Sequence, residues 1–401
     1  MKESCKNKLL VSFVIFLGLM DFALAAPVFD ARILQRIDTM AEEAIAKHRT
    51  PSVVIVIGTA DKTLFAKAYG HLTYDDDSPK ATLDTIYDLA SVSKAVGTAT
   101  ATMLLFQDGK LNLDDPVSKY LSSWNTDDKK DIKVRHLLCH TSGLPAYTNV
   151  AKTEEQRRQG EPKSDALIRR IASLPLEYKP GEGWKYSCLN FITLARINEE
   201  VAGMSQETFL RRRLFVPLGM LHTGYYLSEK KKSLAAPTIG KPNFRQGVVH
   251  DPLANYYESD GWRCCGNAGL FSSANDLSKF CQMILSGGKW NGRQILTPST
   301  IRLLGTNQVP EKVGRIFGLG WGLSRSYPYA TSLNQGPDKA VLSHSGYTGT
   351  WIRIDQLAGT FIIILTNRVY PDDTSQGAGI QREITKIVIE NYPFYKNTPA
   401  R

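Results

Sequence analysis

The amino-acid sequence predicts an α+β fold, in which one antiparallel sheet is built from both ends of the chain and a mostly helical region lies between them. Three observations lead to this prediction. Strand-like apolar runs occur near the beginning of the chain, more of them occur near its end, and helical apolar spacing prevails in between. Because strands and helices do not alternate regularly, a parallel doubly wound sheet is disfavoured.

The beginning of the chain predicts a helix followed by a hairpin. Residues 33–46 carry apolar side chains at helical spacing. Residues 52–59 and 63–70 are apolar or alternating and flank Asp61-Lys62, as two strands joined by a tight turn would. This segment supplies the first two strands of the predicted sheet.

The end of the chain predicts the other strands. Three apolar segments joined by turns that contain glycine are expected to be strands: residues 340–344, 350–355 and 360–367. A helical pattern follows over residues 380–389. We therefore expect the sheet to come from about residues 26–84 and 301–401, and the helical region to span about residues 85–300. No Ser/Gly-rich linker separates them, so the middle is expected to be an insertion within one domain.

The first 25 residues have the pattern of a secretory signal peptide. Three lysines in the first eight residues precede an apolar stretch over residues 9–20, and small residues follow up to Ala25. The alternative is a membrane anchor, but a helix of about twelve residues spans only ~18 Å of a hydrocarbon core of roughly 30 Å. We therefore expect cleavage near Ala25 and an exported protein, periplasmic or secreted, with no stable membrane span.

Charge and cysteine content argue against several function classes. The formal net charge of +10 favours anionic partners such as cell-wall polymers, but the basic residues are scattered in short runs, and nucleic-acid binding is not expected. The five cysteines after the signal peptide are odd in number and lack zinc-ligand spacing, and we interpret His136 and His140 as locally packed. We expect neither a metal nor another cofactor, and the sequence leaves the oligomeric state open.

The most informative motif is Ser91-Val92-Ser93-Lys94, which begins a helical pattern over residues 95–106 that closes at Gly109. Positions three apart lie on one face of a helix, so the hydroxyl of Ser91 and the ammonium of Lys94 would point into the same cleft. The unpaired backbone N–H groups at a helix start can also bind an oxyanion. The alternative is a helix cap followed by an exposed lysine.

Two more stretches supply groups that would complete such a site. Tyr186 follows a turn within residues 180–187 and precedes a helical run over residues 189–201. His344-Ser345-Gly346 ends an apolar strand and is followed by Tyr347. A glycine at this position lets the edge of a strand approach a bound acyl group closely.

Together these three motifs resemble those of the penicillin-recognising serine hydrolases, which include class C β-lactamases, low-molecular-weight penicillin-binding proteins and their esterase and D-aminopeptidase relatives. Four further stretches agree in order: residues 136–144, 217–220, 266–272 and 318–321. The resemblance implies a β-lactamase/transpeptidase-like fold and one serine hydrolase domain over residues 26–401. No G-x-S-x-G elbow occurs, which disfavours an α/β-hydrolase.

The resemblance also implies roles for the site residues. Ser91 is expected to be the nucleophile, Lys94 and Tyr186 to share the proton transfer, and the backbone N–H groups of Ser91 and Tyr347 to form the oxyanion hole. His344, Ser345 and Gly346 would bind substrate. A free lysine or tyrosine has a pKa near 10, so either needs ~4 kcal/mol of environmental bias to act as a base at pH 7. Whether Lys94 or Tyr186 is the base stays open.

Three positions depart from the family pattern. Cys188 stands where family members commonly have asparagine, and it is either a reactive thiol near the substrate or a small buried filler. His344 replaces the lysine of classical β-lactamases, which weakens the positive charge offered to a substrate carboxylate, unless it is only a structural histidine. Asn267 stands where the relatives it most resembles often have histidine, and no role is assigned to it.

These observations predict an exported serine hydrolase that forms an acyl intermediate on Ser91. Its substrates are expected to be D-Ala-type peptides or esters, including peptidoglycan-derived ones, so that the activity is carboxypeptidase-like. One alternative is a carboxylesterase or weak β-lactamase that uses the same residues. Another is a non-catalytic protein that binds cell-wall fragments.

Overall fold

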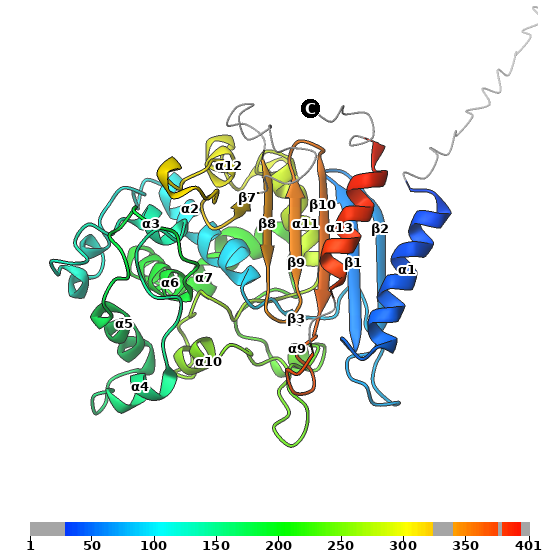
Figure 1. Cartoon of the computed structure of the whole chain (residues 1–401), viewed down its shortest axis with the longest axis horizontal. Helices are drawn as coiled ribbons and strands as arrows, with labels where there is room; N and C mark the ends of the chain where they lie inside the picture. Colours follow the sequence, from blue (N-terminus) through cyan, green and yellow to red (C-terminus); the bar gives the residue numbers. More distant parts are fainter. Residues whose placement is uncertain (1–28, 324–339, 376–378, 394–401) are drawn as a thin grey trace, which may run out of the picture.

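The computed structural model describes residues 29–323, 340–375 and 379–393, so the predicted signal peptide over residues 1–25 lies outside the described residues. Within these ranges, a six-stranded antiparallel sheet runs in the order β2-β1-β10-β9-β8-β7 (Figure 1). Its strands are β1 (Ser52–Thr59), β2 (Thr63–Gly70), β7 (Gly322–Leu323), β8 (Val341–Ser345), β9 (Trp351–Asp355) and β10 (Thr360–Thr366). The first two strands pair with strands from the other end of the chain, so the predicted α+β class is confirmed.

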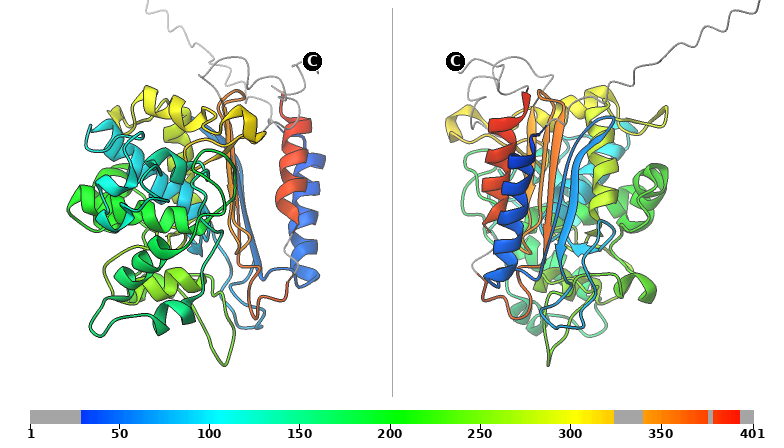
Figure 2. Two further views of the ribbon diagram at one scale, coloured as in Figure 1. Left: turned by 60° about the vertical axis from the view of Figure 1, so that its left-hand side comes forward. Right: turned by 90° about the vertical axis from the view of Figure 1, so that its right-hand side faces the viewer.

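Helices cover both faces of this sheet, as the two views in Figure 2 show. Two helices, α1 (Ala31–Ala46) and α13 (Ile380–Asn391), lie together on one face. On the other face, α11 (Ala274–Leu285) packs against β1 and β10, and the rest of the helical region lies on this side. The sheet is therefore the central layer of three.

The sequence of strand β1 is an apolar run, and it does not alternate between apolar and polar residues, because both faces of the strand are buried. Val53 and Ile55 belong to the apolar cluster under α1 and α13, whereas Val54 and Val56 belong to the large core shared with the helical region. Side chains of a strand alternate between the two faces of its sheet, and both faces are covered here. The central residues of β1 are therefore apolar on both faces.

The helical region contains short helices joined by long loops. They are α2 (Thr100–Gln107), α3 (Val134–Leu138), α4 (Val150–Glu155), α5 (Lys163–Ser173), α6 (Cys188–Ala202), α7 (Gln206–Leu210), α8 (Val216–Leu218), α9 (Glu229–Lys232), α10 (Pro252–Glu258) and α12 (Pro298–Gly305). Two small antiparallel pairs also occur, β3 (Tyr87–Asp88) with β4 (Phe271–Ser272) and β5 (Lys289–Trp290) with β6 (Arg293–Gln294).

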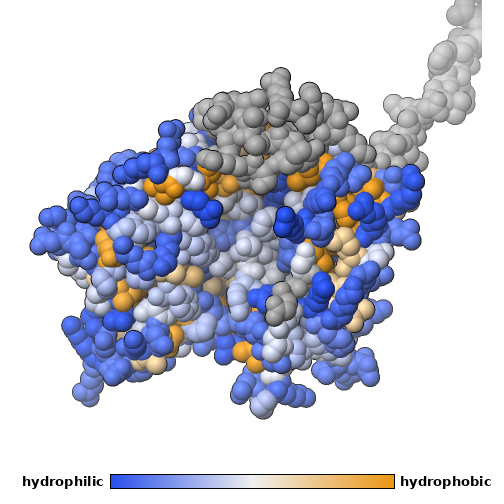
Figure 3. Space-filling view, in the orientation of Figure 1, coloured by the Kyte–Doolittle hydropathy of each residue, from blue (hydrophilic) through white to orange (hydrophobic). Residues whose placement is uncertain are grey.

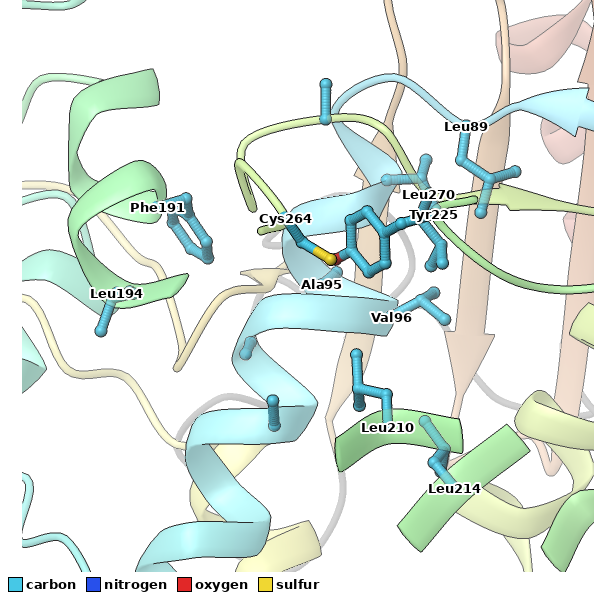
Figure 4. Packing of buried hydrophobic residues seen from close by; sticks show 14 of the residues in the cluster. Leu89, Ala95, Val96, Phe191, Leu194, Leu210, Leu214, Tyr225, Cys264 and Leu270 are labelled. Atoms are coloured by element: carbon cyan, nitrogen blue, oxygen red, sulfur yellow. The ribbon is translucent and has the colours of Figure 1, made fainter. Parts of the chain in front are cut away.

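The helix predicted over residues 95–106 is not a uniform α-helix. Lys94–Ala99 forms a π-helix, and α2 continues from it. Gly97 lies so close to Tyr225 that a Cβ atom would overlap the Tyr225 hydroxyl, and Thr100 donates its hydroxyl to the Ala95 carbonyl at 3.1 Å. Figure 4 shows Ala95 and Val96 of this wide turn inside the apolar core. The π-helix therefore depends on tertiary packing, which the local spacing of apolar residues in the sequence does not reveal.

The surface is mostly polar. On the face shown in Figure 3, hydrophilic residues dominate the outer edges, and residues of intermediate hydropathy lie across the middle. Among residues 29–323, 340–375 and 379–393, no helix has both the length and the apolar content that crossing a bilayer requires.

Candidate active site

Ser91 lies in a turn between β3 and the π-helix. The residue before it, Ala90, has a positive φ of 46°, a conformation that residues with a Cβ rarely adopt. Asp88 holds this turn, because its buried carboxylate accepts the N–H of Ala90 at 2.8 Å and the N–H of His250 at 2.7 Å. Burial raises the pKa of Asp88 to about 6, although the two N–H donors act in the opposite direction. The strained turn directs the Ser91 side chain toward a cavity.

Lys94 lies fully buried beneath Ser91. Its Nζ donates to Ser91 Oγ at 3.0 Å and to the backbone oxygen of Asn267 at 2.7 Å, and it lies 5.1 Å from the centre of the Tyr186 ring. Burial lowers the pKa of Lys94, but Cys188 and Tyr186 raise it when they are ionised, and the net direction of its pKa is upward. The ammonium form of Lys94 therefore favours an anion beside it.

Tyr186 is fixed by the buried ring of His140. The two ring centres are 4.5 Å apart, and His140 Nδ1 accepts the backbone N–H of Ser187 at 3.1 Å. Burial and the charge of Lys94 hold the pKa of His140 well below its usual value, so the ring is neutral. The Tyr186 hydroxyl is itself buried, makes no close hydrogen bond within the described chain, and interacts with the ammonium of Lys94. Tyr186 lines the cavity, so it can exchange a proton with a bound molecule.

The end of β8 is tied directly to the segment that precedes Ser91. Thr348 Oγ1 donates to the Asp88 carbonyl at 2.7 Å, and Thr350 Oγ1 donates to the Leu89 carbonyl at 2.9 Å. Gly346 lies between these contacts, where a Cβ atom would overlap both Thr350 Oγ1 and the Leu89 oxygen. Only glycine permits this approach of the strand to the serine turn.

A cavity of about 650 Å³ opens over these groups. It is lined by Ser91, Trp184, Tyr186, Arg315, Phe317, Gly322, Ser343, His344, Ser345, Gly346, Tyr347 and Trp351. The structure thus brings the three predicted motifs to one place. Lys94 lies below the cavity, and Cys188, the first residue of α6, is not among the residues that line it.

Two backbone donors at the cavity are unoccupied. Neither the N–H of Ser91 nor that of Tyr347 donates to another described residue. The Tyr347 side chain is held in place, because its hydroxyl donates to Asp373 at 2.9 Å and the Arg368 guanidinium lies 4.4 Å from its ring centre. A pair of fixed, unpaired N–H groups beside a nucleophile can bind a developing oxyanion.

His344 lines the cavity without a positive charge. Burial, with the charge of Lys94, lowers its pKa to about 3, so the ring is neutral at ordinary pH. Its Nδ1 lies 2.9 Å from the Ser345 carbonyl, and a carbonyl oxygen can only accept. The proton of the neutral ring therefore resides on Nδ1, and Nε2 is an acceptor. This position supplies no cation for a substrate carboxylate.

A sequence profile of the family described as Beta-lactamase matches residues 37–385. The chain belongs to the beta-lactamase family. This match and the relatives below confirm the predicted resemblance to the penicillin-recognising serine hydrolases and the prediction that the chain is a serine hydrolase. A protein of Escherichia coli O157:H7 named "Putative D-alanyl-D-alanine carboxypeptidase" is 30% identical over 348 residues, which cover 79% of this chain and 78% of that protein. A protein of the same name from Salmonella typhimurium is 26% identical over 400 residues, covering 90% and 91%.

Two solved structures share the fold of the chain. A beta-lactamase/D-alanine carboxypeptidase from Pseudomonas syringae superimposes with a TM-score of 0.69 at 19% identity, covering 90% of this chain and 99% of that one. EstCE1, a hydrolase with promiscuous acyltransferase activity, gives a TM-score of 0.67 at 23% identity, covering 89% and 98%. At these identities the likeness concerns the fold alone.

The sequence assigned no role to Asn267 and did not single out Arg315 or Phe317 at this beta-lactamase family site. Asn267 holds Lys94 through its backbone oxygen, while its side chain amide donates to Asp251 at 3.1 Å. A backbone contact leaves no trace in residue type. Arg315 and Phe317 come from a loop without periodicity, although Phe317 adjoins the recognised stretch at residues 318–321.

The structure also shows the state of the cysteines and of the side chains that could bind a metal ion. Each of Cys139, Cys188, Cys264, Cys265 and Cys281 is a free thiol. No group of three or more His, Cys, Asp or Glu side chains arranged to hold a metal ion occurs in the described part of the chain. His140 packs against the ring of Tyr186.

Proposed function

We propose that this beta-lactamase family hydrolase cleaves its substrates through an acyl intermediate on Ser91. The observation that carries the proposal is the 3.0 Å hydrogen bond from the buried Lys94 to Ser91 Oγ at the base of an open cavity. The substrate carbonyl oxygen would lie between the unpaired N–H groups of Ser91 and Tyr347. These donors would stabilise the charge that develops as Ser91 Oγ attacks the carbonyl carbon.

The hydrogen bonds of Lys94 favour Tyr186 as the group that exchanges the proton, because Lys94 Nζ already donates to Ser91 Oγ and to the backbone oxygen of Asn267. An ammonium that donates to Ser91 Oγ has no lone pair with which to accept a proton. In this route the Ser91 proton passes to the oxygen of an ionised Tyr186 as the acyl bond forms, and then to the departing amine or alcohol. Water attacks the acyl group in the second half, and its proton passes to Tyr186. Tyr186 then gives that proton to Ser91 Oγ as the acyl bond breaks, which restores the free hydroxyl and the ionised Tyr186.

We infer that the substrates are D-Ala-terminated peptides, as expected for a carboxypeptidase. The names of the two relatives at 30% and 26% identity support this substrate class. Export is part of the same proposal, because peptidoglycan lies outside the cytoplasm, and the pattern of residues 1–25 supports it.

A carboxylesterase is the second candidate function. The observation that favours it is the neutral His344, which offers no charge to a terminal carboxylate. Neutral esters need no such charge, and their alcohol leaving groups depart more readily than amines do.

The two candidates separate in one set of assays. Release of D-Ala from an N-acyl-D-Ala-D-Ala peptide would be compared with hydrolysis of neutral p-nitrophenyl esters. Ser91→Ala should abolish both activities, and Ser93→Ala is the matched control, because Ser93 is buried and only accepts the N–H of Leu270. Fast ester turnover without D-Ala release would exclude the carboxypeptidase function. Equal rates for wild type and Ser91→Ala would exclude the acyl-Ser91 mechanism.

A further inference from the structure

One residue gives the cavity its charge. Among the described residues that line the cavity, Arg315 is the only one with a charged side chain. His344 is neutral, and the charge of Lys94 is buried below the cavity, where its Nζ already donates to two oxygens. Of the cations in the described part of the chain, the one that a substrate entering this cavity meets is the guanidinium of Arg315.

The side chain of Arg315 is positioned by an aromatic wall. Its guanidinium carbon lies 4.5 Å from the ring centre of Trp184, at a distance typical of cation–π stacking. Trp184 in turn packs against Phe317 and His140, with ring centres 5.8 Å and 6.0 Å away. The backbone that follows is also held, since the Phe317 carbonyl accepts the N–H of Gln308 at 2.9 Å and the Phe317 side chain is buried. Arg315 thus projects from a supported loop.

The donors of Arg315 are unused. The residue is exposed, and it forms no hydrogen bond or ion pair with any other residue of the described chain. A stacked guanidinium keeps its edge donors available while its face is covered, and that edge matches the two oxygens of a carboxylate. Stacking on Trp184 also reduces the rotamer freedom that binding would otherwise remove.

We propose that Arg315 binds a carboxylate of the substrate and makes this enzyme prefer acyl substrates that carry one. The proposal rests on the proposed acyl-Ser91 function, since it names the substrate class of that same site. It assigns to a loop residue the charge that the His344 position does not supply. Arg315 is thus a specificity-determining residue, and its contribution lies in substrate binding rather than in proton transfer.

The test uses two matched pairs of esters. In one pair the leaving group carries a carboxylate or the corresponding carboxamide, and in the other pair the acyl group does. Arg315→Gln removes the charge, and Arg315→Lys keeps it without the planar fork. Lys312→Gln is the matched control, because Lys312 is an exposed cation in the same loop that does not line the cavity.

In one of the two pairs, wild type should hydrolyse the carboxylate ester with a kcat/KM at least about tenfold above that of the carboxamide ester. The pair that shows this preference tells whether Arg315 contacts the leaving group or the acyl group. Arg315→Gln should lose that preference mainly through a higher KM for the carboxylate ester. Its kcat/KM for the carboxamide ester should stay within about twofold of wild type. Arg315→Lys should fall in between, and Lys312→Gln should match wild type. An equal loss on both members of a pair, or no preference in wild type, would overturn the proposal.

A binding measurement separates this proposal from the proposed function. Ser91→Ala protein would be titrated calorimetrically with N-acetyl-D-alanine and with its amide, with and without Arg315→Gln. Binding of the acid that Arg315→Gln removes supports the role of Arg315 even if no ester is turned over. Turnover that depends on Ser91, with acid and amide bound equally, supports the mechanism and refutes the role of Arg315.

Discussion

The buried, neutral His344 predicts a measurable loss of stability in acid. Its pKa is about 3 in the folded protein because of burial and the charge of Lys94, against about 6.5 in an unfolded chain. The unfolded chain therefore binds the proton more tightly than the folded protein does. A histidine with a lowered folded pKa leaves stability intact above pH 6.5 and removes it progressively as the pH falls toward 3.

The magnitude follows from the linkage relation. A pH of 5 lies about 1.5 units below the pKa of the unfolded histidine, so the unfolded chain is protonated there while the folded ring is still neutral. The free energy of unfolding is therefore lower by about 2 kcal/mol at pH 5 than at pH 7. His344→Asn places an amide donor near the position of Nδ1 and removes the titration. The free energy of unfolding of wild type, minus that of His344→Asn, should therefore fall by about 2 kcal/mol between pH 7 and pH 5.

Urea unfolding followed by far-UV circular dichroism at the two pH values provides the measurement. Other titrating groups, such as His140 and Asp88, are present in both proteins and cancel in the difference. A difference that stays constant within about 0.5 kcal/mol would show that His344 is charged or exposed in the folded protein. The account of the cavity's charge would then be wrong.

Three further substitutions test the geometry around Ser91. Gly346→Ala should displace the end of β8 through overlap with Thr350, which lowers the free energy of unfolding by about 1–3 kcal/mol in urea and lowers kcat/KM steeply. Lys94→Met should abolish ester hydrolysis in a spectrophotometric assay but change Tm little, because the desolvation cost that it removes offsets the two buried hydrogen bonds that it loses. Thr350→Val should break the 2.9 Å bond to Leu89, with a loss of about 1 kcal/mol in urea unfolding and a several-fold lower kcat/KM at unchanged pH dependence.

The fold could be predicted from the sequence where local pattern and tertiary environment agree. Strands β1 and β10 are apolar runs because they lie in the middle of the central layer and are buried on both faces, so their pattern reports their burial directly. The π-helix at Lys94–Ala99 could not be predicted in this way. It depends on contacts between residues far apart in the chain, such as Gly97 and Tyr225.

The site was predictable to the extent that its chemistry depends on side-chain type. Ser91, Lys94 and Tyr186 were expected together from their motifs, and the structure places Lys94 in contact with both other residues. The contribution of Asn267 is a backbone oxygen, and that of Arg315 depends on how its loop packs on Trp184. Neither leaves a pattern in a single sequence. The loss of charge at His344 was foreseen only in part, since its cause is burial.

The central claim is that Ser91 forms a covalent acyl intermediate. Intact mass spectrometry after treatment with a fluorophosphonate and with a penicillin tests it most directly, on wild type, Ser91→Ala and the control Ser93→Ala. The account predicts one added probe mass on wild type and on Ser93→Ala, and none on Ser91→Ala. An adduct that persists on Ser91→Ala, or the absence of any adduct on wild type, would contradict it.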